Sequence, residues 1–141
     1  MIIKLLGAGA VMLCGAAYSL TVQKKLKNEI EENLSALRIF KKIRCEISDF
    51  STPLYDIFAS EGINGGLCEY LDSLSPQLQE LLAEAKLLGR SYKSGELRLC
   101  ERLLGRLEDR QRLLSSKLGE KLAIARVKGF GLSAATVILL L

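Results

Sequence analysis

The sequence predicts an all-α protein: an antiparallel helical bundle with an N-terminal transmembrane helix and a C-terminal short hydrophobic membrane segment. The chain has 141 residues, of which 49% are hydrophobic, and its mean hydropathy is positive. All charged residues except Lys4 lie between Lys24 and Lys128. Within that charged section, apolar residues recur at helical spacing. We therefore expect an anchor over residues 1–23, a helical domain over 24–128 and a hydrophobic segment over 129–141.

The predicted anchor rests on residues 5–23, "LLGAGAVMLCGAAYSLTVQ", which contain no charge. A helix of this length measures roughly 28 Å, about the thickness of the hydrocarbon core of a bilayer. A cleaved signal peptide is the alternative, with Lys4 before the apolar run and small residues at Gly15, Ala16 and Ala17. The apolar run continues past that site, so we expect an uncleaved anchor.

The C-terminal residues 129–141, "GFGLSAATVILLL", also lack charge. As a helix they reach roughly 20 Å, which is too short to span a bilayer alone. Counting from Ala123, the run contains only two charged residues, Arg126 and Lys128, whose long side chains can extend to the headgroups. A buried core strand is the alternative, but nothing else in the chain has a strand pattern to pair with it. We expect a second, short membrane-inserting segment.

Basic residues predict the orientation in the membrane. Only Lys4 precedes the anchor, whereas seven basic residues follow it between Lys24 and Arg44. Because loops rich in Lys and Arg stay in the cytosol, the helical domain is expected there and the N-terminus outside.

The section between the two apolar ends predicts about five helices joined by short turns, which is typical of a bundle. A helix from about Lys25 to Phe50 and a last helix from about Glu96 into the tail have apolar faces. The next helix would begin at Ser51 or Thr52 with Pro53 inside it, and another at Ser75 with Pro76, ending near Gly89. Turns are expected at Gly62, at Asn64-Gly65-Gly66 and over "RSYKSGELRLC". The two apolar faces contain Leu26, Ile30, Leu34, Leu37, Ile43 and Ile47, and Leu99, Leu103, Leu107, Leu114, Leu118 and Leu122.

Charge is divided unevenly along the helical domain. Residues 24–85 carry seven basic and eleven acidic side chains, a net of −4, and residues 86–128 carry twelve basic and five acidic, a net of +7. One reading of the arginines in the last helix is a solvated face, partly neutralised by Glu101, Glu108 and Asp109 and by the acidic first half of the domain. The other is a docking surface for an acidic protein partner or anionic lipid headgroups. The candidate partner-binding residues recur every four positions on one helix face: Arg98, Arg102, Arg106 and Arg110.

The residues needed for common catalytic and ligand sites are missing from the sequence. It has no His, and Cys14, Cys45, Cys68 and Cys100 are isolated, which fits neither a zinc site nor a disulfide framework. It has no phosphate-binding glycine loop. Only Tyr92 lies near the arginines to stack on a base, so nucleic acid is not an expected partner. We expect no enzymatic activity, cofactor, metal or small-molecule substrate.

Four passages together resemble a known family. They are "KLLGA" before the anchor, "LRIFKKIRCEISDFSTPLYDIF", "LLGRSYKSGELRLCERLLGRLEDR" and the closing "KGFGLSAATVILLL". In this order the chain resembles the stage III sporulation protein AB family of endospore-forming bacteria. The most specific matches are Leu37-Arg38, Glu46-Ile47, Thr52-Pro53-Leu54 and Leu88-Gly89.

The resemblance implies a location and a partner. It implies a protein of the mother-cell membrane facing the forespore, within the channel complex that links the two cells. The helical domain would be similar to the cytoplasmic domain of type II secretion F proteins. It would dock a cytosolic secretion-type ATPase like stage III sporulation protein AA, together with other channel proteins. The resemblance assigns no functional residue.

The residues leave two other classes open. The first is a small membrane-active or lipid-organising protein, in which the basic helix and the short tail act on the bilayer directly. The second is an exported helical protein released by signal cleavage. The sequence favours the non-enzymatic membrane adapter over both.

Overall fold

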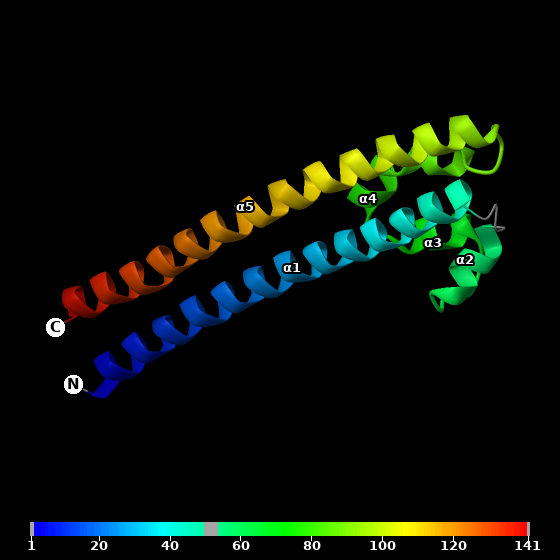
Figure 1. Ribbon diagram of the computed structural model, residues 1–141. Helices are drawn as coiled ribbons and strands as arrows, with labels where there is room; N and C mark the ends of the chain where they lie inside the picture. Colours follow the sequence, from blue (N-terminus) through cyan, green and yellow to red (C-terminus); the bar gives the residue numbers. More distant parts are fainter. Residues whose placement is uncertain (1, 50–53, 141) are drawn as a thin grey trace. The chain divides into compact units, whose positions relative to one another are not determined.

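The computed structural model describes residues 2–49 and 54–140. Within these ranges, the side chains of residues 2–5, 8, 55, 129, 130, 132, 133, 136, 137, 139 and 140 are not described. Every regular element in the described ranges is a helix, which confirms the all-α prediction (Figure 1). The elements are α1 (Ile2–Asp49), α2 (Leu54–Ser60), α3 (Leu67–Ser73), α4 (Pro76–Leu81), the 3₁₀-helix η1 (Ala83–Leu87) and α5 (Lys93–Leu140).

The chain forms two compact units, and each unit contains part of both long helices. Unit 1 consists of Met1–Ile30 and Leu113–Leu141, and unit 2 of Glu31–Arg112. The predicted boundaries at residues 23 and 128 concern position relative to a membrane, and they stay a prediction.

Helix α1 joins the predicted anchor and the first predicted domain helix without a break. Residues 16–49 contain neither Gly nor Pro, so nothing in this stretch interrupts the backbone hydrogen bonding of the helix. Phe50 and the predicted capping residues Ser51, Thr52 and Pro53 lie outside the described residues.

The helix predicted from Ser75 to Gly89 is divided into α4 and η1. Pro76 occupies the first helical position, as predicted. Ser75 is at the N-cap, but its hydroxyl makes no capping bond. Its backbone N–H instead donates to Oε1 of Glu32 on α1, at 2.7 Å. Gly89 ends the segment with φ +86°, a left-handed conformation that favours glycine.

Helix α5 begins at Lys93, three residues before the predicted start at Glu96. The carbonyl of Tyr92 accepts bonds from the N–H groups of Gly95, at 2.8 Å, and Glu96, at 3.0 Å. These bonds make Lys93–Glu96 the first helical turn. The predicted turn over "RSYKSGELRLC" is therefore wrong beyond Tyr92, because Gly95 is accommodated within the helix.

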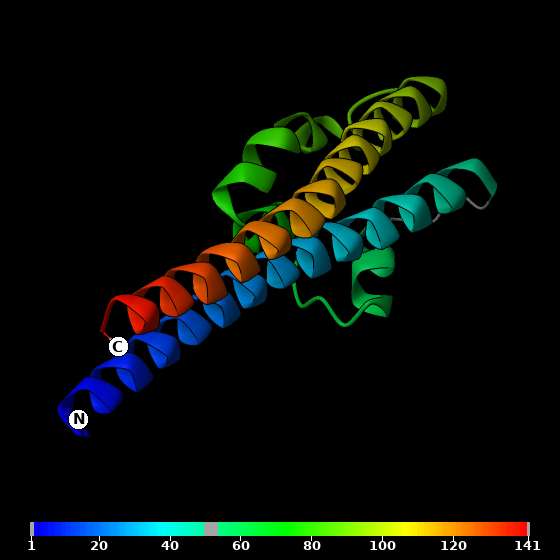
Figure 2. The same ribbon diagram turned by 90° about the vertical axis from the view of Figure 1, so that its left-hand side faces the viewer.

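Unit 2 encloses one hydrophobic core, formed between α1, α5 and the short helices (Figures 1 and 2). The ring of Phe58 on α2 lies 5.7 Å from that of Tyr70 on α3. Of the predicted apolar faces, five residues belong to this core and Leu99 packs against it: Leu37, Ile43, Ile47, Leu103 and Leu107. Leu34 remains 44% exposed, and the other predicted face residues lie in unit 1. The largest fully buried apolar side chains lie on α1, α2, α4 and α5 and at Leu82, which directly follows α4. They are Phe40, Ile43, Ile57, Phe58, Leu78, Leu82, Leu103 and Leu107.

Unit 1 is a pair of helical segments, one from α1 and one from α5. Leu26, Leu114 and Ala125 are its buried apolar residues among the described side chains. Val22 and Leu26 of α1 line a narrow seam with Leu118, Leu122 and Ala125 of α5. Unit 1 therefore has a thin apolar contact rather than an enclosed core.

Candidate functional site

The predicted arginine stripe lies on α5, and structure shows what three of its four members contact. Arg106 Nη2 donates to Glu84 Oε1 at 2.9 Å, and Arg102 Nη1 donates to Glu84 Oε2 at 3.3 Å. Arg110 Nη2 donates to Gln77 Oε1 at 3.2 Å. Arg98 is exposed at the start of the stripe. The stripe therefore faces the α4–η1 segment, to which three arginines are bonded.

Glu84 on η1 neutralises part of this stripe. The hydrogen bond from Arg106, with the charge of both guanidinium groups, holds the pKa of Glu84 below its usual value. The sequence predicted partial neutralisation by Glu101, Glu108 and Asp109 and by the acidic first half of the domain, to which Glu84 belongs. Glu101 instead pairs with Arg44 and Glu108 with Lys41, because these carboxylates lie on the side of α5 toward α1. Spacing along one helix could not reveal the partner from η1.

A groove of about 390 Å³ opens between α1 and α5 in unit 2. Lys41, Arg44 and Cys45 line it from α1, and Glu101, Leu104, Gly105 and Glu108 line it from α5. Ion pairs cross between its two sides: Lys41 Nζ to Glu108 Oε1 at 3.6 Å and Arg44 Nη2 to Glu101 Oε1 at 3.0 Å. This groove is not among the sites predicted from the sequence. Its signal in the sequence is Gly105 within a helix, with Glu101 four positions before it and Glu108 three positions after it.

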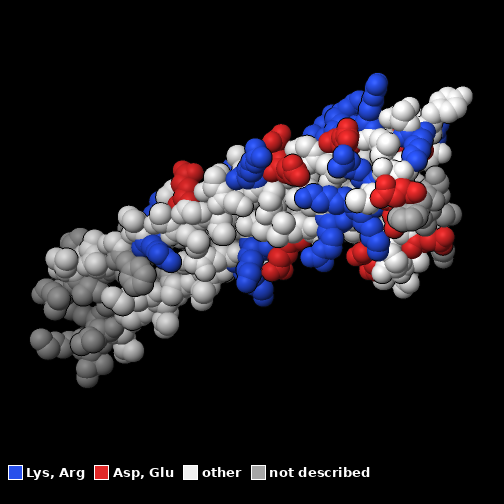
Figure 3. All heavy atoms as spheres, in the orientation of Figure 1, with Lys and Arg blue, Asp and Glu red and all other residues white. Residues whose placement is uncertain are grey.

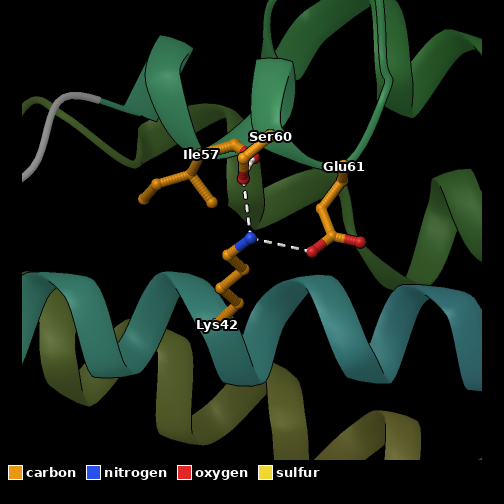
Figure 4. A network of polar contacts seen from close by, with 4 residues as sticks. All are labelled: Lys42, Ile57, Ser60 and Glu61. Atoms are coloured by element: carbon orange, nitrogen blue, oxygen red, sulfur yellow. Dashed lines mark hydrogen bonds and ion pairs between the residues drawn. The ribbon is translucent and has the colours of Figure 1, made fainter.

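A second polar network fastens α2 to α1 (Figure 4). Lys42 Nζ donates to Ser60 Oγ at 2.6 Å and pairs with Glu61 Oε1 at 2.9 Å. Ser60 in turn donates to the carbonyl oxygen of Ile57 at 2.7 Å. The bond and charge of Lys42 lower the pKa of Glu61. All groups of this network have partners, so it holds the end of α2 in place.

Two polar side chains of unit 2 are buried: Asn33 on α1 and Tyr70 on α3. Asn33 is fully buried, and its Nδ2 donates to the Leu107 carbonyl at 3.1 Å and to Gln111 Oε1 at 2.8 Å. The hydroxyl of Tyr70 is buried, and burial together with the Glu32 charge raises the pKa of Tyr70 to about 12. The two Nδ2 bonds connect α1 to α5 at this level, whereas Oδ1 of Asn33 is buried without a hydrogen-bond partner among the described residues.

Charged side chains cover much of the visible face of unit 2 (Figure 3). Unit 1 differs, because large apolar side chains at its ends face outward. Leu6, Leu13, Tyr18 and Leu20 are each at least 64% exposed, and Ile138 of α5 is 74% exposed. Leu6, Leu13 and Leu20 recur every seven residues and so share one face of α1, which makes this face a candidate interaction surface.

The structure can be compared with the two predicted membrane segments, residues 1–23 and 129–141. In the part of the chain that the structure describes, no helix combines the length and hydrophobicity needed to cross a bilayer. Side chains are not described for residues 1–5 and 8 of the predicted anchor at 1–23. The same holds for nine residues of the predicted segment at 129–141. Their insertion into a membrane stays a prediction.

The cysteines and acidic residues offer no metal centre within the described ranges. All four thiols are free, with Cys14, Cys45 and Cys68 exposed and Cys100 buried. Burial raises the pKa of Cys100 to about 11, so this thiol stays protonated at neutral pH.

Comparison with known proteins found no matching family description, no matching curated protein and no matching solved structure.

Proposed function

We propose that this chain is a non-enzymatic adapter that is anchored to a membrane by unit 1 and carries a docking surface on unit 2. The observation that carries the anchoring is the outward-facing apolar surface of the charge-free helix ends. Leu13 is 72% exposed and Leu20 is 64% exposed, although burying a leucine side chain is worth about 1.5–3 kcal/mol. Hydrocarbon would cover these side chains, whereas the seam of unit 1 does not.

The charge pattern supports the same arrangement. The apolar end of α1 leads into Lys24, Lys25 and Lys27, and the apolar end of α5 follows Arg126 and Lys128. Basic residues at both borders would meet anionic headgroups on the cytosolic side. In this orientation the N-terminus is outside, and unit 2 stays in the cytosol.

The partner in this proposal comes from the resemblance to the stage III sporulation protein AB family. That resemblance favours a cytosolic secretion-type ATPase, with the adapter in the mother-cell membrane facing the forespore. The stripe Arg98, Arg102, Arg106 and Arg110 is the proposed contact. The bonds to Glu84 leave the side chain of Arg102 60% exposed and that of Arg106 42% exposed. Arg98 is exposed at the start of the stripe.

The docking test uses Arg98→Glu, because charge reversal at Arg102 or Arg106 would also disrupt the contacts with Glu84. Arg112→Glu is the matched control, since Arg112 is an exposed arginine of α5 outside the stripe. Full-length tagged protein is purified from sporulating cells in mild detergent, and bound proteins are identified by mass spectrometry. We expect the ATPase with wild type and with Arg112→Glu, and much less with Arg98→Glu. Absence of the ATPase from all three samples after crosslinking would contradict the proposed partner.

The exposed apolar ends also support a second candidate, a membrane-active protein. The two candidates differ in the behaviour of purified protein with liposomes. An adapter binds vesicles without releasing an entrapped dye, whereas a membrane-active protein releases it in the absence of any partner.

A further inference from the structure

We infer that the groove between α1 and α5 in unit 2 is a self-association surface that receives a second copy of this chain, with both copies oriented in the same direction. The two rims of the groove carry opposite charge. Lys41 and Arg44 form a basic rim on α1, and Glu101 and Glu108 form an acidic rim on α5. The inference concerns unit 2 alone, so it holds whether or not unit 1 enters a bilayer.

Gly105 gives the groove its depth. A Cβ added to Gly105 would meet no atom within 4 Å, so no neighbour within the chain requires glycine there. Glycine in the middle of a helix is unfavourable relative to alanine. Close approach of another chain is a physical reason for glycine at such a position. The volume of the groove, about 390 Å³, is large enough to receive side chains from another chain.

The charged side chains of both rims are exposed enough to exchange their ion pairs within the chain for ion pairs with a second copy. The side chains of Lys41 and Glu108 are 60% and 49% exposed, and those of Arg44 and Glu101 are 50% and 55% exposed. Ion pairs this exposed contribute little within one chain. They can therefore be exchanged for pairs between two copies at small cost.

The charges select one symmetry. The pairs Lys41–Glu108 and Arg44–Glu101 run in opposite sequence directions, so α1 and α5 are antiparallel at the groove. A two-fold axis parallel to the helices places α1 of one copy over α5 of the other, and each basic rim then faces an acidic rim. A two-fold axis across the helices would place α1 over α1, with basic rims together. Electrostatic complementarity therefore favours the first arrangement, which is isologous and closes as a dimer.

The first test fills the groove of the full-length protein. Gly105→Trp blocks it, and Gly119→Trp is the control, because Gly119 is also an exposed α5 glycine with open space around it but lies in unit 1. The number of chains per detergent micelle is measured by light scattering after size exclusion. We expect two copies for wild type and for Gly119→Trp, and one for Gly105→Trp. One copy for wild type, or the same number for both variants, overturns the inference.

A second test does not depend on how Gly105→Trp folds. One chain carries Lys41→Glu and Arg44→Glu, and the other carries Glu101→Lys and Glu108→Lys. Each chain alone would place like charges on both facing rims, so we expect one copy per micelle. An equimolar mixture restores opposite charges at both contacts, and we expect two copies, one of each kind. Dimers of either chain alone, or no dimer in the mixture, overturns the inference.

Discussion

Arg106 on α5 donates a hydrogen bond to Glu84 on η1 at 2.9 Å, and Arg102 binds the other oxygen of the same carboxylate. One acidic side chain thus connects two turns of the long helix to the short segment that precedes it. This contact gives part of the basic stripe a role inside unit 2. It also means that charge reversal at Arg106 tests folding and docking together.

The Glu84 contact predicts a pH-dependent contribution to stability. The pKa of Glu84 is lower in the folded chain than the ordinary value of 4.5, so the unfolded chain binds more protons as the pH falls. The stabilisation is present above the ordinary value and is lost as the pH falls through the lowered pKa. We expect Glu84→Gln to lower the Tm at neutral pH, with a difference from wild type that disappears in acid. A pH-independent difference would show that the charge of Glu84 is not responsible.

Asn33→Ala is expected to lower the free energy of unfolding by about 1 kcal/mol, because it removes two hydrogen bonds between α1 and α5 at a fully buried position. Urea unfolding measures this change. Asn28→Ala is the matched control, since Asn28 is exposed on the same helix. An equally small effect of both substitutions would show that the Asn33 bonds do not stabilise the contact between α1 and α5.

Two glycines should respond to alanine in opposite directions. Gly119 is helical with open space around it and lies outside the groove, so Gly119→Ala should stabilise the chain by about 0.5–1 kcal/mol. Gly89 has φ +86°, and Gly89→Ala should destabilise the chain by about 1–2 kcal/mol. Thermal or urea unfolding gives both values. Stabilisation by Gly89→Ala would contradict the left-handed turn before α5.

Leu13→Arg should weaken binding to vesicles, because a charged residue deep in a membrane helix costs about 2.5–3.5 kcal/mol. Leu87→Arg is the control, since Leu87 is 52% exposed but lies on η1 in unit 2. Flotation of full-length protein with liposomes measures binding. Equal flotation of both variants would show that the end of α1 does not carry the membrane contact.

The helices could largely be predicted from local sequence. The Pro76 start and the stop at Gly89 depend on backbone properties of single residues, and the apolar spacing marks the faces of α1 and α5. The start of α5 was placed too late, because Gly95 was interpreted as part of a turn. The helix from Ser75 was predicted as continuous, but α4 ends at Leu81 and the 3₁₀-helix η1 follows from Ala83.

The candidate surfaces could be predicted only in part. A four-residue period locates Arg98, Arg102, Arg106 and Arg110 on one helix face, but it cannot identify Glu84 as the group that faces them. The groove depends on residues more than fifty positions apart, such as Arg44 and Glu101. Asn33 was missed because its burial depends on Leu107 and Gln111 across the helix pair. These features are tertiary contacts, and the periodicity of one segment does not predict contacts between segments.

The measurement that tests the proposed anchoring most directly is thiol labelling of the native cysteines with a membrane-impermeant maleimide. Cys14 in the apolar end of α1 is exposed in the structure, as are Cys45 and Cys68 in unit 2, and Cys100 is a buried internal control. Full-length protein is added to preformed vesicles, and labelled peptides are identified by mass spectrometry. We expect Cys45 and Cys68 to react, Cys14 to react only after detergent is added, and Cys100 to react only after unfolding. Labelling of Cys14 at the rate of Cys45 in protein bound to intact vesicles would contradict anchoring by unit 1.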